Sequence, residues 1–120
     1  MKSGWKKYKD QRYFLADYSG FGTNFETLKL EVDAADSILV KEPPDSVRVL
    51  LDFRGTVGSI EVVNYFKDSS ARTRTYVKKN AVLGISGVRK VLLESVSRIT
   101  GHVAQAFDDE DKALEWLFTA

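Results

Sequence analysis

The densest short run of apolar residues in the chain spans residues 47–53, and the neighbouring segments are arranged around it. Five of its seven residues are large and apolar, which is too many for a strand with one face in water. A short apolar run that closes near a glycine, here Gly55, is typical of a parallel strand buried on both faces and covered by helices. Residues 47–53 are therefore predicted to form the central strand of an α/β sheet.

Two helical patterns flank this strand. In the first, Asn24 is a good N-cap, and apolar side chains then recur at steps of three and four, forming one stripe of Phe25, Leu28, Val32, Ala35 and Leu39. The two prolines at 43–44 stop that helix because proline lacks an N–H donor and restricts the residue before it. After the central strand, Ser59 is predicted to cap a second helix, with Val63 and Phe66 on its buried face.

The same reasoning predicts strands at residues 5–8, 13–18, 81–86 and 102–107, a helix from residue 88 to the C′ glycine Gly101, and a last helix capped by Asp108. The lysine-rich residues 5–8 suit an antiparallel edge strand. The chain thus reads as an α/β fold of four successive strand–helix units, with a mainly parallel sheet in sequential order. Residues 1–11 are assigned as an N-terminal segment or edge strand, and residues 12–120 as one α/β domain.

Right-handed crossovers place the turns after successive parallel strands at one edge of the sheet, where ligands of open α/β folds bind. Gly20, Gly55 and Gly87 are therefore predicted to meet at that edge. Asp17 and Asp52 should end neighbouring strands there, and two hypotheses are open for them. Paired carboxylates can hold Mg²⁺ or divide acid and base roles. Alternatively, each aspartate ties down its own turn through hydrogen bonds to the backbone.

A second candidate lies where a predicted strand ends and a helix starts, at Ser86 and Gly87, followed by Arg89 and Lys90. Free N–H groups at such a junction can hold an anion. The stretch lacks the length and the Lys-Ser/Thr ending of a P-loop, so nucleotide hydrolysis is unsupported. A tight structural turn is the alternative.

Charge is uneven along the chain although the formal net charge is only +1. Between residues 69 and 102 a single acid, Glu94, accompanies seven basic residues: Arg72, Arg74, Lys78, Lys79, Arg89, Lys90 and Arg98. Residues 108–115 hold five acids and one lysine. A basic patch on the second and third helices could meet an acidic protein, a phosphate-bearing ligand or an anionic membrane surface. The alternative is a solvated helix face.

Composition excludes several classes of function. At 120 residues the chain is expected to form one domain, and with no cysteine it has no disulfide, thiolate nucleophile or cysteine-bound metal. The single histidine, His102, excludes a histidine-rich metal site, and no cofactor is predicted. No nucleic-acid reader motif is present in this nearly neutral chain. No apolar run approaches ~18 residues, so a cytoplasmic protein without stable membrane insertion is expected.

Several segments resemble the small bacterial STAS-like proteins, relatives of the sporulation anti-sigma-factor antagonists that are grouped with the CRAL-TRIO fold. The resemblance runs from residue 12 to 117, through residues 49–55, 76–87, 91–93 and the ending Lys-Ala-Leu-Glu-Trp-Leu at 112–117. It implies a sheet in sequential order, helices wound alongside it, and a role in binding rather than catalysis. Antagonists of that family carry a phosphorylated Ser or Thr in an Asp-Ser-Ser-Gly-like loop. Here that loop, residues 54–59, lacks the motif, although Thr56 and Ser59 lie in its neighbourhood.

The working hypothesis is a non-enzymatic regulatory or binding domain that engages a partner protein through the carboxyl edge of the strands and the helix after the central strand. The candidate binding residues are Asp17, Gly20, Asp52, Arg54, Gly55, Thr56, Ser59, Ser86, Gly87, Arg89 and Lys90. A small-molecule or lipid-binding domain that uses the same edge is the main alternative. A metal-dependent enzyme that uses Asp17 and Asp52 is a third, and a homodimer is left open.

Overall fold

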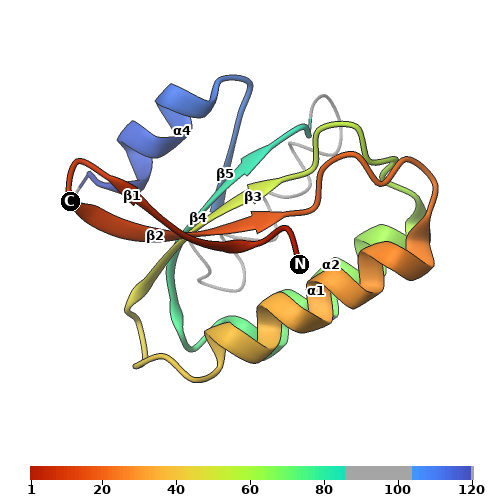
Figure 1. Ribbon diagram of the computed structural model, residues 1–120, viewed down its shortest axis with the longest axis horizontal. Coiled ribbons are helices and arrows are strands. Elements are labelled where there is room, and N and C mark those ends of the chain that lie inside the picture. Colours follow the sequence, from red (N-terminus) through yellow and green to blue (C-terminus); the bar gives the residue numbers. More distant parts are fainter. Residues whose placement is uncertain (86–103, 120) are drawn as a thin grey trace.

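A twisted sheet separates two layers of helix in the computed structural model, which describes residues 1–85 and 104–119 (Figure 1). Within these residues the sheet has five strands in sequential order: β1 (Gly4–Tyr8), β2 (Gln11–Asp17), β3 (Val47–Asp52), β4 (Val77–Leu83) and β5 (Ala104–Phe107). β1 runs antiparallel to β2, and the other neighbours are parallel. The predicted α/β fold, its strand order and its antiparallel edge strand are confirmed.

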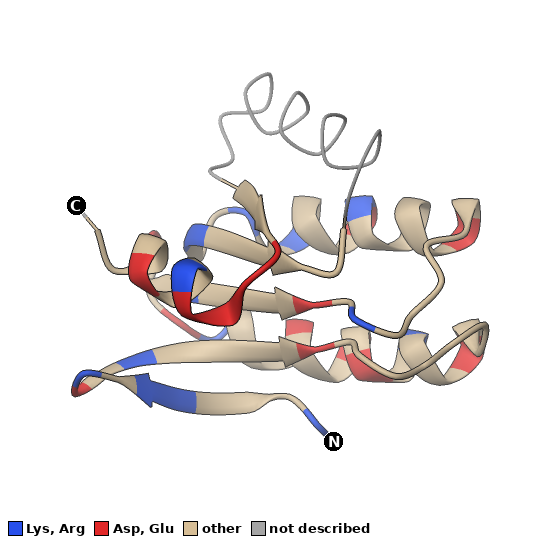
Figure 2. Cartoon of the chain, turned by 90° about the horizontal axis from the view of Figure 1, so that it is seen from above, with Lys and Arg blue, Asp and Glu red and all other residues tan. Residues whose placement is uncertain are grey.

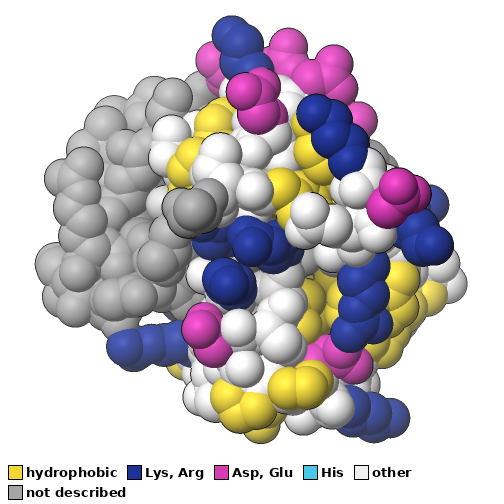
Figure 3. Space-filling view, turned by 90° about the vertical axis from the view of Figure 1, so that its left-hand side faces the viewer, with side chains coloured by type: hydrophobic (Ala, Val, Ile, Leu, Met, Phe, Trp, Pro, Cys, Tyr) yellow, Lys and Arg dark blue, Asp and Glu magenta, His cyan; other side chains and the backbone are white. Residues whose placement is uncertain are grey.

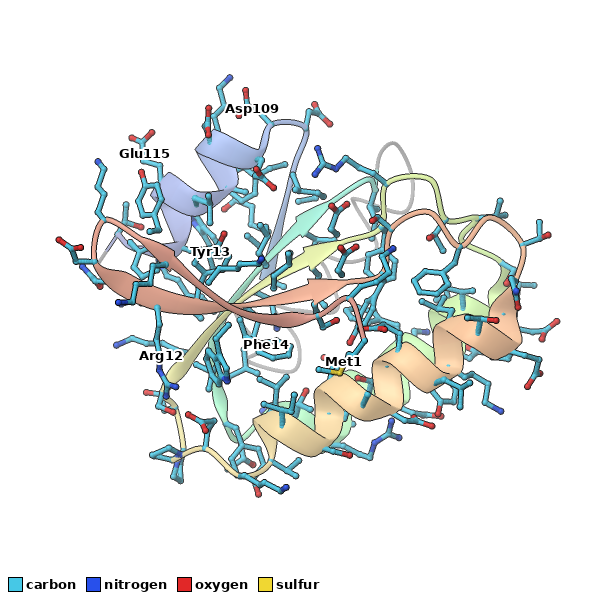
Figure 4. The ribbon with its side chains drawn as sticks, viewed as in Figure 1. Met1, Arg12, Tyr13, Phe14, Asp109 and Glu115 are labelled. Carbon is cyan, nitrogen blue, oxygen red and sulfur yellow. The ribbon has the colours of Figure 1, made fainter. Side chains whose placement is uncertain are left out.

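Helices α1 (Phe25–Leu39) and α2 (Ile60–Thr73) lie side by side on one face of the sheet, and α4 (Glu110–Leu117) covers the other (Figure 1). Each face has its own apolar core. Tyr13 and Phe14, consecutive on β2, point to opposite faces because side chains alternate along a strand (Figure 4). In the central strand β3, Val49 and Leu51 pack toward α1 and α2 while Leu50 packs toward α4, and all three are buried.

Polar side chains begin the helices. The side chain of Asn24 accepts a hydrogen bond from the Thr27 N–H at 3.2 Å, and that of Ser59 accepts one from the Val62 N–H at 3.2 Å, so both predicted caps are confirmed. The predicted cap Asp108 is wrong. Asp109 is the last residue before α4 with an extended backbone, and its Oδ1 accepts from the N–H groups of the next turn.

The buried face of α2 matches the prediction at Phe66 and differs from it at Val63. Phe66 packs edge-on against Phe53 as part of the core, whereas Val63 is 38% exposed and its neighbour Val62 is buried instead. Beyond Phe66 the face continues through buried Ser69 and Thr73. Burial of polar groups here is stabilised by Asp36 of α1, whose carboxylate accepts hydrogen bonds from Ser69 Oγ at 2.7 Å and from an arginine of α2 at 2.9 Å. Burial raises the pKa of Asp36, although these hydrogen bonds oppose the shift.

Two strand boundaries also differ from the predictions. β4 begins at Val77, four residues before the predicted start at residue 81, because its polar residues have partners: Lys79 reaches the end of α4, and Asn80 is buried beneath α1 and α2. Of the predicted strand at residues 102–107, Ala104–Phe107 is described. The helix predicted from residue 88 lies outside the described residues. No helix in the described ranges is long and apolar enough to span a membrane.

Candidate functional site

The carboxyl ends of β2 and β3 form a joined edge rather than two separate loops. Asp17 and Asp52 are register partners at the ends of these strands, as predicted. Backbone hydrogen bonds continue the pairing beyond them. The N–H groups of Tyr18, Gly20 and Gly22 donate to the carbonyl oxygens of Asp52, Arg54 and Gly55 at 2.9 Å each, and Val57 N–H donates back to Gly22 at 2.8 Å. We call these paired segments, residues 18–22 and 52–57, the loop ladder.

Glycine is needed where the loop ladder is tightest. Gly20 and Gly55 have positive φ angles of 72° and 76°, and a Cβ on Gly55 would lie 3.3 Å from the Gly20 nitrogen, so these two corners meet as predicted. The third predicted corner, Gly87, lies outside the described residues. Gly84 instead approaches the ladder from the end of β4, because a Cβ there would lie 2.6 Å from the Arg54 nitrogen.

The hydroxyl groups of Thr56 and Ser59 are committed to structure. Thr56 Oγ1 accepts a hydrogen bond from the Phe21 N–H at 3.1 Å and donates to the Tyr18 carbonyl oxygen, which clamps the two halves of the loop ladder together. Ser59 Oγ is the N-cap of α2. Modification of either hydroxyl would therefore first have to break the contacts that shape this edge.

Each edge aspartate holds its own turn. Asp17 Oδ1 accepts hydrogen bonds from the N–H and hydroxyl of Ser19 and lies 3.5 Å from Lys2 Nζ. Burial alone would raise the pKa of Asp17, but the Ser19 hydrogen bonds and the Lys2 charge outweigh it, so that the pKa falls below its ordinary value. Asp52 accepts from the backbone N–H and the guanidinium of Arg54 at 2.9–3.0 Å.

These contacts match the turn hypothesis for both aspartates. The guanidinium of Arg54 also lies 3.6 Å from Glu110 at the start of α4, which ties the central strand to the helix on the other face. The described residues contain no cluster of three or more His, Cys, Asp or Glu side chains that could hold a metal ion.

The N-terminal segment is fastened beside the same edge by a residue that the sequence analysis did not single out. The buried carboxylate of Glu31 on α1 accepts hydrogen bonds from the N–H groups of Lys2 at 3.2 Å and Ser3 at 2.8 Å. Ser3 Oγ in turn accepts from the Asp17 N–H at 2.9 Å. Burial would raise the pKa of Glu31, but the hydrogen bonds lower it overall. The available signal was its position between Leu28 and Ala35 on the buried stripe of α1.

The two ends of the sheet carry opposite charge (Figure 2). Near the carboxyl ends of the parallel strands, three described basic residues (Lys2, Arg54 and Lys112) face eight described acids: Asp17, Glu26, Asp52, Glu61, Asp108, Asp109, Glu110 and Asp111. At the opposite end (Figure 4), four acids (Asp10, Glu42, Asp45 and Glu115) accompany seven basic residues: Lys9, Arg12, Lys41, Arg48, Arg74, Lys78 and Lys79. Figure 3 looks onto this second end and shows Lys and Arg side chains across its middle.

Some basic residues of the patch predicted on the second and third helices are engaged within the fold or lie outside the helices. Arg72 pairs with Asp36, and Lys79 donates to the carbonyl oxygens of Trp116 and Thr119 at 3.0 and 3.1 Å. Lys78 and Lys79 belong to β4 and lie at the end of the sheet away from the loop ladder. The candidate residues Ser86, Gly87, Arg89 and Lys90 lie outside the described residues.

Apolar side chains are exposed where the loop ladder leads into α2. Val57, Ile60 and Val63 are 51%, 79% and 38% exposed. Val57 belongs to the loop ladder, and Ile60 and Val63, three residues apart in α2, lie on the same side of that helix. We call these three residues the apolar line. Scattered exposed apolar residues are ordinary on protein surfaces, whereas neighbouring ones beside a shaped edge mark interaction sites.

The two best-formed cavities in the described part of the protein are small. Both lie beneath α1 and α2, and their volumes are about 20 and 10 Å³. The first is lined by Tyr18, Asp36 and Asn80 among others and has room for one water molecule. The second is lined by Phe53 among others, so the side chains that the loop ladder turns inward border spaces too small for an organic ligand.

Comparison with known proteins identifies the class of fold. The chain matches no protein-family model, and no curated protein is a significant match to its sequence. Among solved structures it is similar to the crystal structure of an uncharacterized DUF3478-family protein with a SpoIIAA-like fold from Shewanella loihica PV-4. The TM-score is 0.65 and the sequence identity 18%, over 96% of this chain and 91% of that one. The protein therefore has a SpoIIAA-like fold, and the STAS-like resemblance of its sequence is confirmed at that level.

Proposed function

We propose that this protein is a non-enzymatic binding domain with a regulatory role, which engages a partner protein through the loop ladder and the first turn of α2. The observation that carries the proposal is the apolar line of Val57, Ile60 and Val63. Ile60 leaves 79% of its surface in water at the position where the chain enters the helix after the central strand. Covering one large aliphatic side chain contributes roughly 1.5–3 kcal/mol, so a partner gains most by binding at this residue.

The surroundings of the apolar line favour a protein as the partner. The loop ladder fixes Val57 through its N–H bond to Gly22, and the Ser59 cap fixes the start of α2, so little chain entropy is lost when a partner binds. A preorganised surface with apolar residues at its centre and charged residues around it has the anatomy of a protein interface. A small ligand would instead need a cavity, and the two best-formed cavities in the described residues hold one water at most.

Charge defines the kind of partner surface. Glu61 follows Ile60 directly, Glu26 occupies the first turn of the adjacent helix α1, and acids predominate around the described part of this edge. The complementary surface is an apolar patch bordered by lysine and arginine side chains, because like charges placed opposite each other would oppose association.

The proposal gives Asp17 and Asp52 structural rather than catalytic roles. Oδ1 of Asp17 and both carboxylate oxygens of Asp52 accept hydrogen bonds within their own turns. A homodimer, which the sequence analysis left open, is one form of this proposal, because a second copy of the protein could bind at the apolar line.

The experiment uses a photoreactive amino acid at position 60, with position 30 as the matched control. Leu30 is 71% exposed on α1 and therefore reports labelling by any exposed apolar site. Irradiation in the source cells should give a crosslinked protein from position 60 that is absent from position 30. That partner is then purified, and its Kd is measured by calorimetry for the wild type, Ile60→Asp and Leu30→Asp.

Ile60→Asp should weaken this complex by at least about tenfold, since about 1.4 kcal/mol corresponds to a factor of ten in Kd, and Leu30→Asp should not. Both variants should keep the melting temperature of the wild type. A Kd that is unchanged in Ile60→Asp would overturn the proposal. Self-crosslinking that sedimentation confirms as a dimer would identify a second copy as the partner.

A further inference from the structure

The outer edge of β1 is a second candidate interaction site. β1 is the outermost strand of the described sheet, and no described element lies beyond it (Figure 2). Its residues pair with β2 on one side only, from Gly4 opposite Leu15 to Tyr8 opposite Gln11. An outer edge of this kind presents backbone N–H and C=O groups to which another strand can bind.

The charge of this edge is of one sign. Residues 1–9 contain Lys2, Lys6, Lys7 and Lys9 and no acid. Lys6 and Lys7 are exposed in the middle of β1 and point to opposite faces of the sheet, since their register partners are Tyr13 and Arg12. Within the described residues, neither lysine side chain takes part in a hydrogen bond or an ion pair.

Three of the other cations near this strand are already engaged. Arg12 pairs with Glu42 and stacks over the Trp5 ring, with its guanidinium carbon 4.0 Å from the ring centroid. Arg48 donates to the Leu117 carbonyl oxygen, and Lys79 donates to carbonyl oxygens at the end of α4. Lys6 and Lys7 are therefore the cations that combine exposure with a place on an open strand edge.

We propose that β1 accepts an extended acidic segment of a partner protein, which adds to the sheet as a further strand beside β1. Main-chain hydrogen bonds to β1 supply the binding mode, and Lys6 and Lys7 select the sequence. Because the two lysines are consecutive and face opposite sides, the added strand meets both only when it carries two adjacent acids.

A strand fits this edge better than other anionic partners do. A membrane surface or a nucleic acid would cover the whole end of the sheet, where Asp10, Glu42, Asp45 and Glu115 lie among the cations and repel it. A strand paired with Gly4–Tyr8 meets Lys6 and Lys7 before it reaches the turn that holds Asp10. The same lysines prevent two copies of this protein from pairing through β1, because like charges would lie opposite each other.

The test uses three fluorescently labelled peptides of about nine residues, the length of a long strand. The first carries two adjacent glutamates among valines and threonines. The second has the same composition, with the glutamates separated by one residue so that both side chains face one side of the sheet. The third repeats the first with alternate backbone nitrogens methylated, which keeps the charges and removes the hydrogen-bond donors. Fluorescence anisotropy with the full chain should show the first peptide binding about tenfold more tightly than either of the others.

The test variant carries both Lys6→Glu and Lys7→Glu, and the control variant carries Lys67→Glu on the exposed surface of α2. The double variant should lose about tenfold in affinity for the first peptide, the control should not, and shifts of the amide resonances should fall on Gly4–Tyr8. Equal binding of the methylated peptide would overturn strand addition. Equal binding of the peptide with separated glutamates would overturn the role of the lysine pair. Binding to phosphatidylserine vesicles or to a DNA duplex that is tighter than to the first peptide would overturn the choice of an acidic segment.

Discussion

The two ends of the sheet are stabilised in different ways. At the carboxyl end, backbone groups pair with backbone groups across the loop ladder, and the Thr56 hydroxyl clamps the result. At the amino end, charged side chains join the sheet to a helix. Arg48 and Lys79 both donate hydrogen bonds to carbonyl oxygens in the last turn of α4, and they are register partners on β3 and β4. Cations suit that position because the carboxyl end of a helix carries partial negative charge.

The difference shows where a function can be built. An edge held by its own backbone leaves the side chains of Val57, Ile60 and Val63 free to face a partner. An end held by its charged side chains commits several of them to the fold, and of the exposed cations Lys6 and Lys7 lie on the open strand edge of β1. The two proposed interfaces therefore use side chains that do not stabilise the fold.

Breaking the carboxyl end at its tightest contact should have the largest effect. Gly84→Ala places a methyl group 2.6 Å from the Arg54 nitrogen at a φ angle of +87°, so both strain and collision oppose it. The free energy of unfolding in urea should fall by roughly 3 kcal/mol. Gly22→Ala is the matched control, because it has a φ angle of +57° with no atom within 4 Å of the added group, and should lose about 1 kcal/mol. Equal losses in both variants would show that the approach of β4 to the loop ladder is not tight.

Releasing the N-terminal segment from this same end should have an intermediate effect that depends on pH. The folded pKa of Glu31 lies below its ordinary value of 4.5, so its contribution is complete above that pH and is lost as the pH falls through the folded pKa. Glu31→Gln should lower the free energy of unfolding by about 1–2 kcal/mol at neutral pH, with the difference shrinking under acid conditions. Glu26→Gln, at an exposed site on the same helix, should change it by no more than about 0.5 kcal/mol. A difference for Glu31→Gln that stays constant with pH would contradict the assignment.

Loosening the amino end should have the smallest effect. Lys79→Met removes the contacts of Nζ with Trp116 and Thr119, but burial and the nearby charge of Arg48 lower the pKa of Lys79 and offset part of what these contacts contribute. A loss of about 0.5 kcal/mol is expected by urea titration, with increased hydrogen exchange in the last turn of α4. Lys78→Met changes the exposed neighbour and should leave both unchanged. A larger loss than for Gly84→Ala would reverse the ranking of the two ends.

Much of the fold could be predicted because burial leaves a simple trace in the sequence. Residues 47–53 are apolar on both faces, and the caps Asn24 and Ser59 stand just before apolar periodicity begins. The phase of α2 could not be predicted, since Val62 and Val63 are equally apolar and the stripe continues through Ser69 and Thr73. Those two are buried because Asp36, distant in sequence, accepts a hydrogen bond from Ser69, and Thr73 Oγ1 donates to the Ser69 carbonyl oxygen.

The position of the candidate site could be predicted from the sequence, but the hydrogen bonds that shape it could not. Parallel pairing with right-handed crossovers brings the ends of neighbouring strands to one edge, so the places of Asp17 and Asp52 could be inferred from strand order. The hydrogen bonds of the loop ladder involve backbone atoms, which every sequence has, and so they leave no pattern to read. The exposure of Ile60 could not be predicted either, because it depends on how α2 is turned against the sheet.

The loop ladder has a consequence for how this protein can change over time. Inserting a residue into either half would shift its N–H and C=O groups away from their partners in the other half, leaving several unpaired at once. The length of one loop is thereby fixed by the length of the other. Diversity at this surface must come from swapping side chains on a constant backbone, or from matched insertions that lengthen both segments together.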